Sequence, residues 1–173
     1  MTWRLRGAWI EDLHAIMELE RATFPDDAWS ENLMRAELES EHTHYIVAFP
    51  EGDPTDLRGY AGLMMPRGAT EADIQTVAVA ADARRMGLGR LLVRTLVNTA
   101  RDAGAHEVFL EVREDNTAAR SLYTELGFEQ IGVRPGYYQP GNVAAVVMKH
   151  VIRRGSESAS GGGPESGDGG DPR

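Results

Sequence analysis

Apolar residues recur at the spacing of an amphipathic helix in four segments of the chain, and two of these segments lie near its start. One stripe runs through residues 10–24 and is interrupted only by Glu20. Pro25 ends this segment, because proline lacks an N–H and restricts the residue before it. A second helix is expected to run from Ser30, whose hydroxyl can cap it, to Glu39.

The other two helical segments lie in the second half of the chain. Leucines and a valine make an amphipathic stripe over residues 88–97, and Gly104 marks the expected end of that helix. Asn116 is expected to cap a short helix over residues 117–126, which Gly127 closes.

Seven short apolar or alternating runs between the helices predict strands, over residues 3–8, 43–49, 58–66, 72–80, 107–113, 128–134 and 142–151. Helices alternate with strands only in the second half. This order predicts an α/β (α+β) fold with a central mixed sheet and helices on both faces, and not a doubly wound Rossmann sheet. No repeat or linker divides residues 1–152, which are therefore expected to form one domain.

Composition and charge restrict the partners. Residues 153–173 contain almost only Gly, Ser, Pro and charged residues, so we expect a disordered tail. The formal net charge of −9 gives no general attraction to nucleic acid. The start of the chain lacks a signal-peptide pattern and no apolar run is long enough for a membrane helix, so we expect a cytoplasmic protein with no membrane partner, and a monomer by default.

No metal site is expected. The chain has no cysteine, which excludes disulfides and thiolate ligands, and its five histidines follow no ligand spacing.

The stretch Arg84-Arg85-Met86-Gly87-Leu88-Gly89-Arg90 joins a predicted buried strand to a predicted helix. The free N–H groups at a helix start bind anions, and the two glycines allow a ligand to approach the backbone closely. Three arginines add charge-assisted contacts of the kind that phosphates favour. The pattern predicts a pyrophosphate site, although two glycines also suit a tight turn with no ligand.

This stretch resembles the Q/R-x-x-G-x-G/A pyrophosphate motif of the GNAT acyltransferases, which bind acetyl-coenzyme A. Residues 109–128, FLEVREDNTAARSLYTELGF, are similar to that family's LEV…N…A…LY…GF block. The resemblance implies a bulge at Val77-Ala78-Val79, the strand segment that would pair with the pantetheine arm. It implies the following contacts with acetyl-coenzyme A: Val77, Ala78, Val79, Arg84, Arg85, Met86, Gly87, Leu88, Gly89, Arg90, Asn116 and Tyr123.

Within the family, residues 3–150 most resemble the RimI-type ribosomal-protein-alanine N-acetyltransferases. The similar segments are FPDDAWS (24–30), LEVR (110–113) and GYY (136–138). The resemblance implies acetyl transfer to the N-terminal α-amino group of a protein, with a ribosomal protein that begins with Ala as the expected partner. Thr76 departs from the pattern, because RimI-type enzymes often have Asn there.

Two residues are the expected catalysts. Glu111 alternates with apolar neighbours in a strand, where it either forms a structural ion pair or does chemistry. The resemblance implies that Glu111 is the general base. It also implies that Tyr123 is the general acid that protonates the departing thiolate, against the alternative of a tyrosine that only packs in the core.

Substrate contacts are expected from Trp29, Tyr137 and Tyr138, while Glu20 and Asp26 are interpreted as parts of a solvated helix face. Two other functions stay open at this point. One is an acetyltransferase for a small amine such as a polyamine or an antibiotic, and the other is an acyl-coenzyme A-binding sensor without catalysis.

Overall fold

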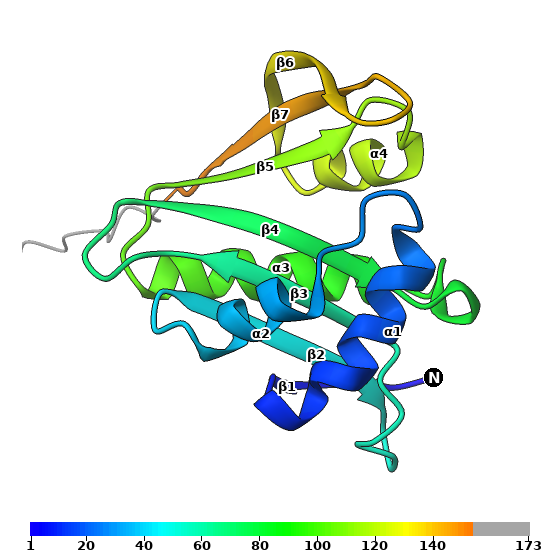
Figure 1. The fold of residues 1–173 in the computed structure, drawn as a ribbon. Coiled ribbons are helices and arrows are strands. Elements are labelled where there is room, and N and C mark those ends of the chain that lie inside the picture. Colours follow the sequence, from blue (N-terminus) through cyan, green and yellow to red (C-terminus); the bar gives the residue numbers. More distant parts are fainter. Residues whose placement is uncertain (154–173) are drawn as a thin grey trace, which may run out of the picture.

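A computed structural model describes residues 1–153 of the 173-residue chain. Seven strands form one sheet in the order β1-β2-β3-β4-β5-β7-β6 (Figure 1). The strands are β1 (Trp3–Gly7), β2 (Thr43–Pro50), β3 (Gly59–Met64), β4 (Glu71–Val79), β5 (Glu107–Arg113), β6 (Glu129–Tyr138) and β7 (Val143–Val151). The helices are α1 (Leu13–Thr23), α2 (Glu31–Glu39), α3 (Leu88–Asp102) and α4 (Thr117–Glu125), with short 3-10 turns η1 (Ile10–Asp12) and η2 (Ala81–Ala83).

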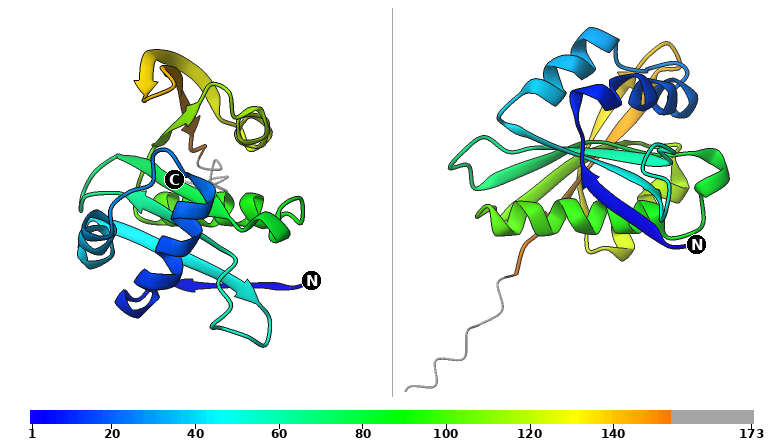
Figure 2. Two further views of the ribbon diagram at one scale, coloured as in Figure 1. Left: turned by 45° about the vertical axis from the view of Figure 1, so that its right-hand side comes forward. Right: turned by 90° about the horizontal axis from the view of Figure 1, so that it is seen from below.

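The helices lie on both faces of the sheet, as the order of elements predicts. Figure 2 shows α1 and α2 on one face and α3 on the other. Ile16, Met17 and Met34 fill the core under α1 and α2, whereas Leu92 and Leu96 of α3 belong to the larger core on the opposite face. The sheet is mixed, because β4 and β5 run parallel and all other neighbouring strands run antiparallel.

Three of the predicted helix ends are confirmed. The Ser30 hydroxyl accepts a hydrogen bond from the Leu33 N–H (3.1 Å), and the Asn116 side chain accepts one from the Ala119 N–H (3.1 Å). Gly104 follows α3 with φ +98°, a left-handed conformation that glycine adopts without strain.

Two boundaries differ from the sequence prediction. Residues 10–12 form a 3-10 turn and the α-helix begins only at Leu13. Tyr137 and Tyr138, expected in a loop, are the last residues of β6, where Tyr138 pairs with Val143. The predicted disordered tail lies outside the described residues, apart from Arg153 at its start.

The parallel pair of strands separates in the middle of the sheet. Residues 71–74 of β4 pair with residues 107–110 of β5, but β4 continues to Val79 and β5 to Arg113 without further pairing to each other. Beyond this point the backbone groups that face the opening have no partner in a strand ladder. The fold therefore opens a gap in its own sheet, between α4 on one side and α1 on the other.

None of the helices within residues 1–153 is long and apolar enough to cross a membrane.

Candidate active site

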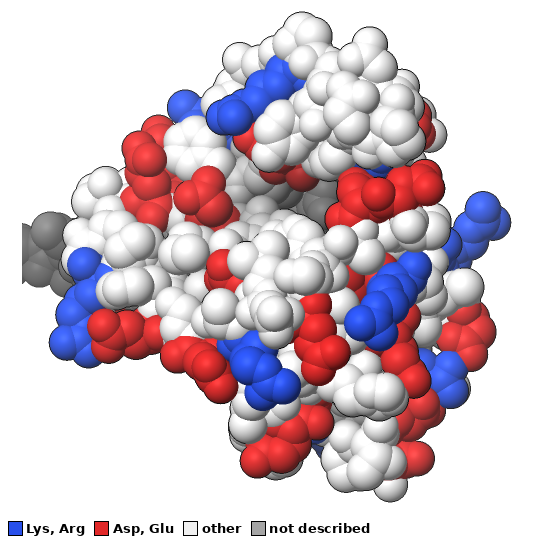
Figure 3. All heavy atoms as spheres, viewed as in Figure 1, with Lys and Arg blue, Asp and Glu red and all other residues white. Residues whose placement is uncertain are grey.

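A cavity of about 590 Å³ lies where β4 and β5 separate. Residues 75–77 of β4 and 109–113 of β5 form its floor, and side chains from α1, α4 and β6 close its walls. In the space-filling view, acidic residues lie on both sides of the hollow that separates β5–β7 from the rest of the sheet (Figure 3). Asp73 shows the effect of this crowding, because burial and the nearby charges of Glu71 and Glu111 raise its pKa.

Glu111 faces this cavity. In β5 the residues at even positions are buried in the α3 core, so the odd-numbered Glu111 is directed to the opposite face. Arg134 of β6 lies 3.1 Å away (Arg134 Nε to Glu111 Oε1), with the two side chains 60% and 28% exposed. The ion pair that the sequence left open as an alternative is thus present, but it lies at the cavity and is accessible to solvent.

The two tyrosines at the end of β6 form the wall beside Glu111. Their rings meet edge to face with centroids 5.0 Å apart, and both line the cavity. The charge of Glu111 raises the pKa of the Tyr137 phenol, while burial, followed by the charge of Glu111, raises that of Tyr138 to about 12. Both phenols are therefore protonated at neutral pH and can donate hydrogen bonds.

Arg113 connects this wall to the opposite one. Its guanidinium lies 5.2 Å from the centre of the Tyr138 ring and 3.8 Å from Asp27 Oδ2, in the segment between α1 and α2. Trp29, in the same segment, also lines the cavity. Both residues lie in segments that carry the family resemblance, but the sequence does not reveal their contact, because it joins residues that are far apart in the chain.

Tyr123 enters the cavity from α4. It is almost fully buried beside Phe128, with ring centroids 5.8 Å apart. Burial, followed by the nearby Tyr138, raises its pKa to about 12. Tyr123 packs in the core and also lines the cavity, so its position is compatible with both alternatives, and its role as general acid stays a prediction.

The arginine–glycine turn lies at the start of α3, outside the lining of the cavity. Gly87 has φ +78° and no side chain caps the helix, so the first N–H groups of α3 stay available to an anion. Arg85 also has a positive φ of 62°. A Cβ on Gly89 would lie 3.3 Å from Leu122 of α4, which shows how closely α3 and α4 approach each other here.

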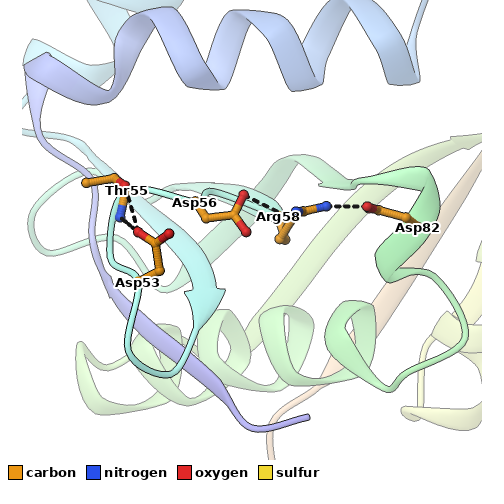
Figure 4. Close-up of polar contacts among 5 residues, drawn as sticks. All are labelled: Asp53, Thr55, Asp56, Arg58 and Asp82. Atoms are coloured by element: carbon orange, nitrogen blue, oxygen red, sulfur yellow. Dashed lines mark hydrogen bonds and ion pairs between the residues drawn. The ribbon is translucent and has the colours of Figure 1, made fainter.

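Ion pairs connect this turn to the segments that surround it. Arg58 bonds Asp56 (Nε to Oδ1, 2.8 Å) in the loop before β3 and also contacts Asp82 in η2 (Figure 4). Asp82 lies two residues before Arg84, so Arg58 connects the 50–57 loop to the start of the turn. Arg84 itself donates to the Val79 carbonyl oxygen (3.2 Å), while Arg90 pairs with Glu125 of α4.

Comparison with known proteins then identifies the family. The Acetyltransferase (GNAT) family model matches residues 13–128, more than half of the chain. This chain belongs to the GNAT acetyltransferase family. GNAT acetyltransferases use acetyl-coenzyme A, and the uncapped start of α3, beside the gap between β4 and β5, suits the diphosphate and arm of that molecule.

Several known acetyltransferases are similar to this GNAT chain. N-alpha-acetyltransferase RimI of Mycobacterium tuberculosis is 37% identical over 142 residues, covering 80% of this chain and 85% of that protein. Streptothricin acetyltransferase of Streptomyces lavendulae is 34% identical over 116 residues, which is 67% of this chain and 60% of that protein. Among solved structures, the ribosomal-protein-S18-alanine N-acetyltransferase of Escherichia coli superposes with a TM-score of 0.80 at 26% identity, covering 91% of this chain and 98% of that one.

Seven of the predicted catalytic, cofactor and substrate residues line the cavity: Trp29, Val77, Glu111, Asn116, Tyr123, Tyr137 and Tyr138. Ala78 and Val79 do not line it. Ala78 is buried in the α1 core, and Val79 packs against the α3 core. The turn residues 84–90 stay together, but at the start of α3. Within residues 1–153 no group of three His, Asp or Glu side chains is arranged to bind a metal.

The expected bulge lies elsewhere in β4. The register between β3 and β4 shifts at Gln75, since Gly62 pairs with Thr76 but Leu63 pairs with Ile74. Residues 77–79 pair regularly with β3. The bulge therefore precedes Val77 by two residues, and Gln75 is the extra residue that the sequence pattern did not reveal.

The interpretation of Glu20 as part of a solvated helix face is wrong. The residue is 1% exposed and lines the cavity. The Trp29 N–H (3.0 Å) and the Tyr60 hydroxyl donate hydrogen bonds to its two carboxylate oxygens. The only signal in the sequence was that Glu20 interrupts an apolar helical stripe, which places a carboxylate on the face that is buried.

Proposed function

We propose that this protein transfers the acetyl group of acetyl-coenzyme A to the N-terminal α-amino group of a protein, with a ribosomal protein that begins with Ala as the substrate. One observation carries the mechanism: Glu111 and Tyr123 enter the same cavity from different elements, at the point where the sheet opens. The bound thioester supplies an activated acetyl group, and the residues below handle the protons.

Glu111 acts as the general base. An α-amino group has a pKa of roughly 7.7–8.0, so a carboxylate can take up its proton as the new C–N bond forms, directly or through one water molecule. The position of Glu111 supports this role, because its side chain lines the cavity and stays partly exposed. Arg134 holds the carboxylate from the side of β6.

Tyr123 acts as the general acid. When the C–S bond breaks, the departing thiolate needs a proton, and the Tyr123 hydroxyl donates it. Burial raises the pKa of Tyr123 to about 12, so the phenol is protonated at neutral pH and can donate a hydrogen bond to the sulfur as negative charge develops on it. The conjugate acid of a thiolate has an ordinary pKa of about 8.5, so the proton transfer from the phenol is uphill, and the phenoxide that it leaves takes a proton from solvent.

Acetyl-coenzyme A is held at two places. The N–H groups at the start of α3, with Gly87, Gly89 and Arg85, bind the diphosphate. Val77 of β4 and Asn116 before α4 lie at the cavity and contact the arm. The remaining contacts with the cofactor are proposed for Ala78, Val79, Arg84, Met86, Leu88 and Arg90.

The peptide lies between two aromatic walls. Trp29 projects from the segment between α1 and α2, and Tyr137 and Tyr138 project from β6. The choice of a protein N-terminus rests on likeness to the M. tuberculosis RimI protein and to the E. coli alanine N-acetyltransferase.

Release of coenzyme A tests the proposal. The chain has no cysteine, so a thiol-reactive dye detects only the released coenzyme A. A peptide with a free N-terminal Ala is expected to turn over, whereas the same peptide with a blocked N-terminus and an intact lysine is not. Turnover on the blocked peptide would reassign the reaction to lysine.

A small amine is the second candidate, supported by likeness to streptothricin acetyltransferase. Polyamines and streptothricin in the same assay separate the two. Turnover on these amines but not on the free peptide would keep the acetyl transfer and overturn the protein substrate.

A further inference from the structure

The bulge in β4 presents two consecutive polar residues to the α1 side of the sheet. Ile74 belongs to the α3 core, and after the extra residue Gln75 the alternation changes, so that Ala78 belongs to the α1 core. Gln75 and Thr76 both line the cavity and both contact tyrosines of the α1 side. In a regular strand, one of these two neighbours would face α3 instead.

Two tyrosines of the neighbouring strands contact Gln75 and Thr76. The Tyr45 hydroxyl donates to Gln75 Oε1 (2.9 Å), and the Tyr45 ring occupies the space that a Cβ on Gly62 would fill. The Tyr60 hydroxyl lies 3.4 Å from Thr76 Oγ1, a long contact in which either oxygen can be the donor. The direction of this second contact depends on the other partner of Tyr60.

That partner is Glu20. The Tyr60 hydroxyl donates to Glu20 Oε2, and the Trp29 N–H donates to Oε1. No Lys, Arg or His among residues 1–153 forms an ion pair with Glu20, so the carboxylate takes its hydrogen bonds from neutral donors. It is buried on the wall opposite to Glu111.

A hydroxyl has one hydrogen to donate. Tyr60 donates its hydrogen to Glu20 Oε2, so its oxygen can only accept from Thr76. Thr76 then directs its own hydrogen toward Tyr60 and keeps its lone pairs for the cavity. The chain Glu20–Tyr60–Thr76 fixes Thr76 as a hydrogen-bond acceptor.

We propose that Thr76 Oγ1 accepts a hydrogen bond from the substrate's amino group, and that Glu20 and Tyr60 are positioning residues that keep it an acceptor. This inference rests on the proposed acetyl transfer to an amine. A primary ammonium has three hydrogens, and one bond to Thr76 leaves two for the proposed base and for water. Thr76 thus selects and orients the amine before Glu111 removes the proton.

A double-mutant cycle tests the inference with Thr76→Val, Tyr60→Phe and the pair. Both substitutions keep the approximate size of the side chain and remove one hydroxyl. Each single variant is expected to raise the peptide KM about tenfold, the effect of losing one hydrogen bond to a charged group, with kcat and the KM for acetyl-coenzyme A within about twofold. The double variant is expected to match the single ones, because both act through the same acceptor.

Thr76→Ser is the matched control, since it keeps the hydroxyl and should retain the wild-type KM. Additive effects of Thr76→Val and Tyr60→Phe, or a wild-type peptide KM in Thr76→Val, would overturn the inference. A fall in kcat alone, at unchanged KM, would also overturn it, because loss of folded enzyme lowers kcat.

Failure of the proposed function has a different signature. If the wild type turns over no amine, the function and the inference both fall. If the wild type turns over only polyamines, the proposal of a protein substrate is wrong. The double-mutant cycle measured with the polyamine then decides the role of Thr76.

Discussion

The two walls of the cavity carry one glutamate each, and the two carboxylates lie in opposite environments. Glu111, on the β5 wall, is partly exposed and pairs with the exposed Arg134. Glu20, on the α1 wall, is fully buried and bonds only to the Trp29 N–H and the Tyr60 hydroxyl among the polar groups of residues 1–153. Burial, the strongest influence, raises the pKa of Glu20, because its two hydrogen bonds do not offset the loss of water.

The difference separates a carboxylate that can react from one that shapes the site. A partly exposed carboxylate can take up a proton and return it to solvent without disturbing its neighbours. A buried carboxylate with two fixed donors cannot change its charge without changing the hydrogen bonds of Trp29 and Tyr60, and so it controls geometry. Substitution of Glu111 is therefore expected to lower activity, whereas substitution of Glu20 is expected to lower stability.

The largest effect is expected for Glu111→Gln. Loss of general base catalysis should lower kcat/KM for the peptide about 10²–10⁴-fold, while the side chain keeps its size. The melting temperature should stay close to the wild-type value, because Glu111 is partly exposed and its ion pair is with a solvent-accessible arginine. Coenzyme A release and a thermal melt of the same preparation measure both quantities.

The reverse pattern in Glu111→Gln, an unstable protein with normal turnover per folded molecule, would contradict the contrast between the walls. It would assign Glu111 to structure.

The next largest effect is expected for Glu20→Ala. The substitution leaves the Trp29 N–H and the Tyr60 hydroxyl without an acceptor and opens a void, so it should lower the free energy of unfolding by about 2–4 kcal/mol. Urea titration measures the change. Glu20→Gln is the matched control, since its amide can bond both groups and should cost clearly less.

Equal losses in Glu20→Ala and Glu20→Gln would show that the negative charge, and not the hydrogen bonds, stabilises the α1 wall.

The sequence predicts the β5 wall better than the α1 wall. Alternation in VFLEV is enough to direct Glu111 away from the α3 core, and the cap at Asn116 fixes where α4 begins and so where Tyr123 lies. Both signals are local, so they can be read from a few neighbouring residues. The positions of the strands along the chain follow from similar local patterns.

The α1 wall depends on contacts between distant residues. Whether Glu20 is solvated or buried is decided by Trp29, nine residues away, and Tyr60, forty residues away. The bulge at Gln75 depends on Tyr45 and Gly62 of two neighbouring strands. A helical stripe reveals that Glu20 interrupts it, but not which donors satisfy the carboxylate.

A pH titration of stability sharpens the comparison further. Because the pKa of Glu20 is raised in the folded state, the folded protein binds a proton more tightly than the unfolded chain. Stability from this group is therefore greatest below the ordinary Glu pKa of about 4.3 and falls as pH rises through the raised value. The groups that face Glu20 are Asp27, Tyr45 and Tyr60, and the two phenols stay neutral in this range because their pKa values are raised.

The measurement is the difference in unfolding free energy between the wild type and Glu20→Gln across this range. It should decline with increasing pH. A rise instead would mean that the ionised Glu20 is stabilised by a positive charge.

The smallest effect is expected for Arg134→Gln. The Arg134–Glu111 pair is exposed and screened by salt, so its loss should change the free energy of unfolding by less than about 1 kcal/mol. Arg4→Gln is the matched control, because Arg4 is as exposed as Arg134 and pairs with Glu51, which is not part of the cavity lining. Only Arg134→Gln should alter kcat/KM for the peptide, by a few-fold, since Arg134 fixes the orientation of the proposed base. A loss of stability as large as that of Glu20→Ala would place Glu111 in the same structural role as Glu20, and the two walls would no longer differ.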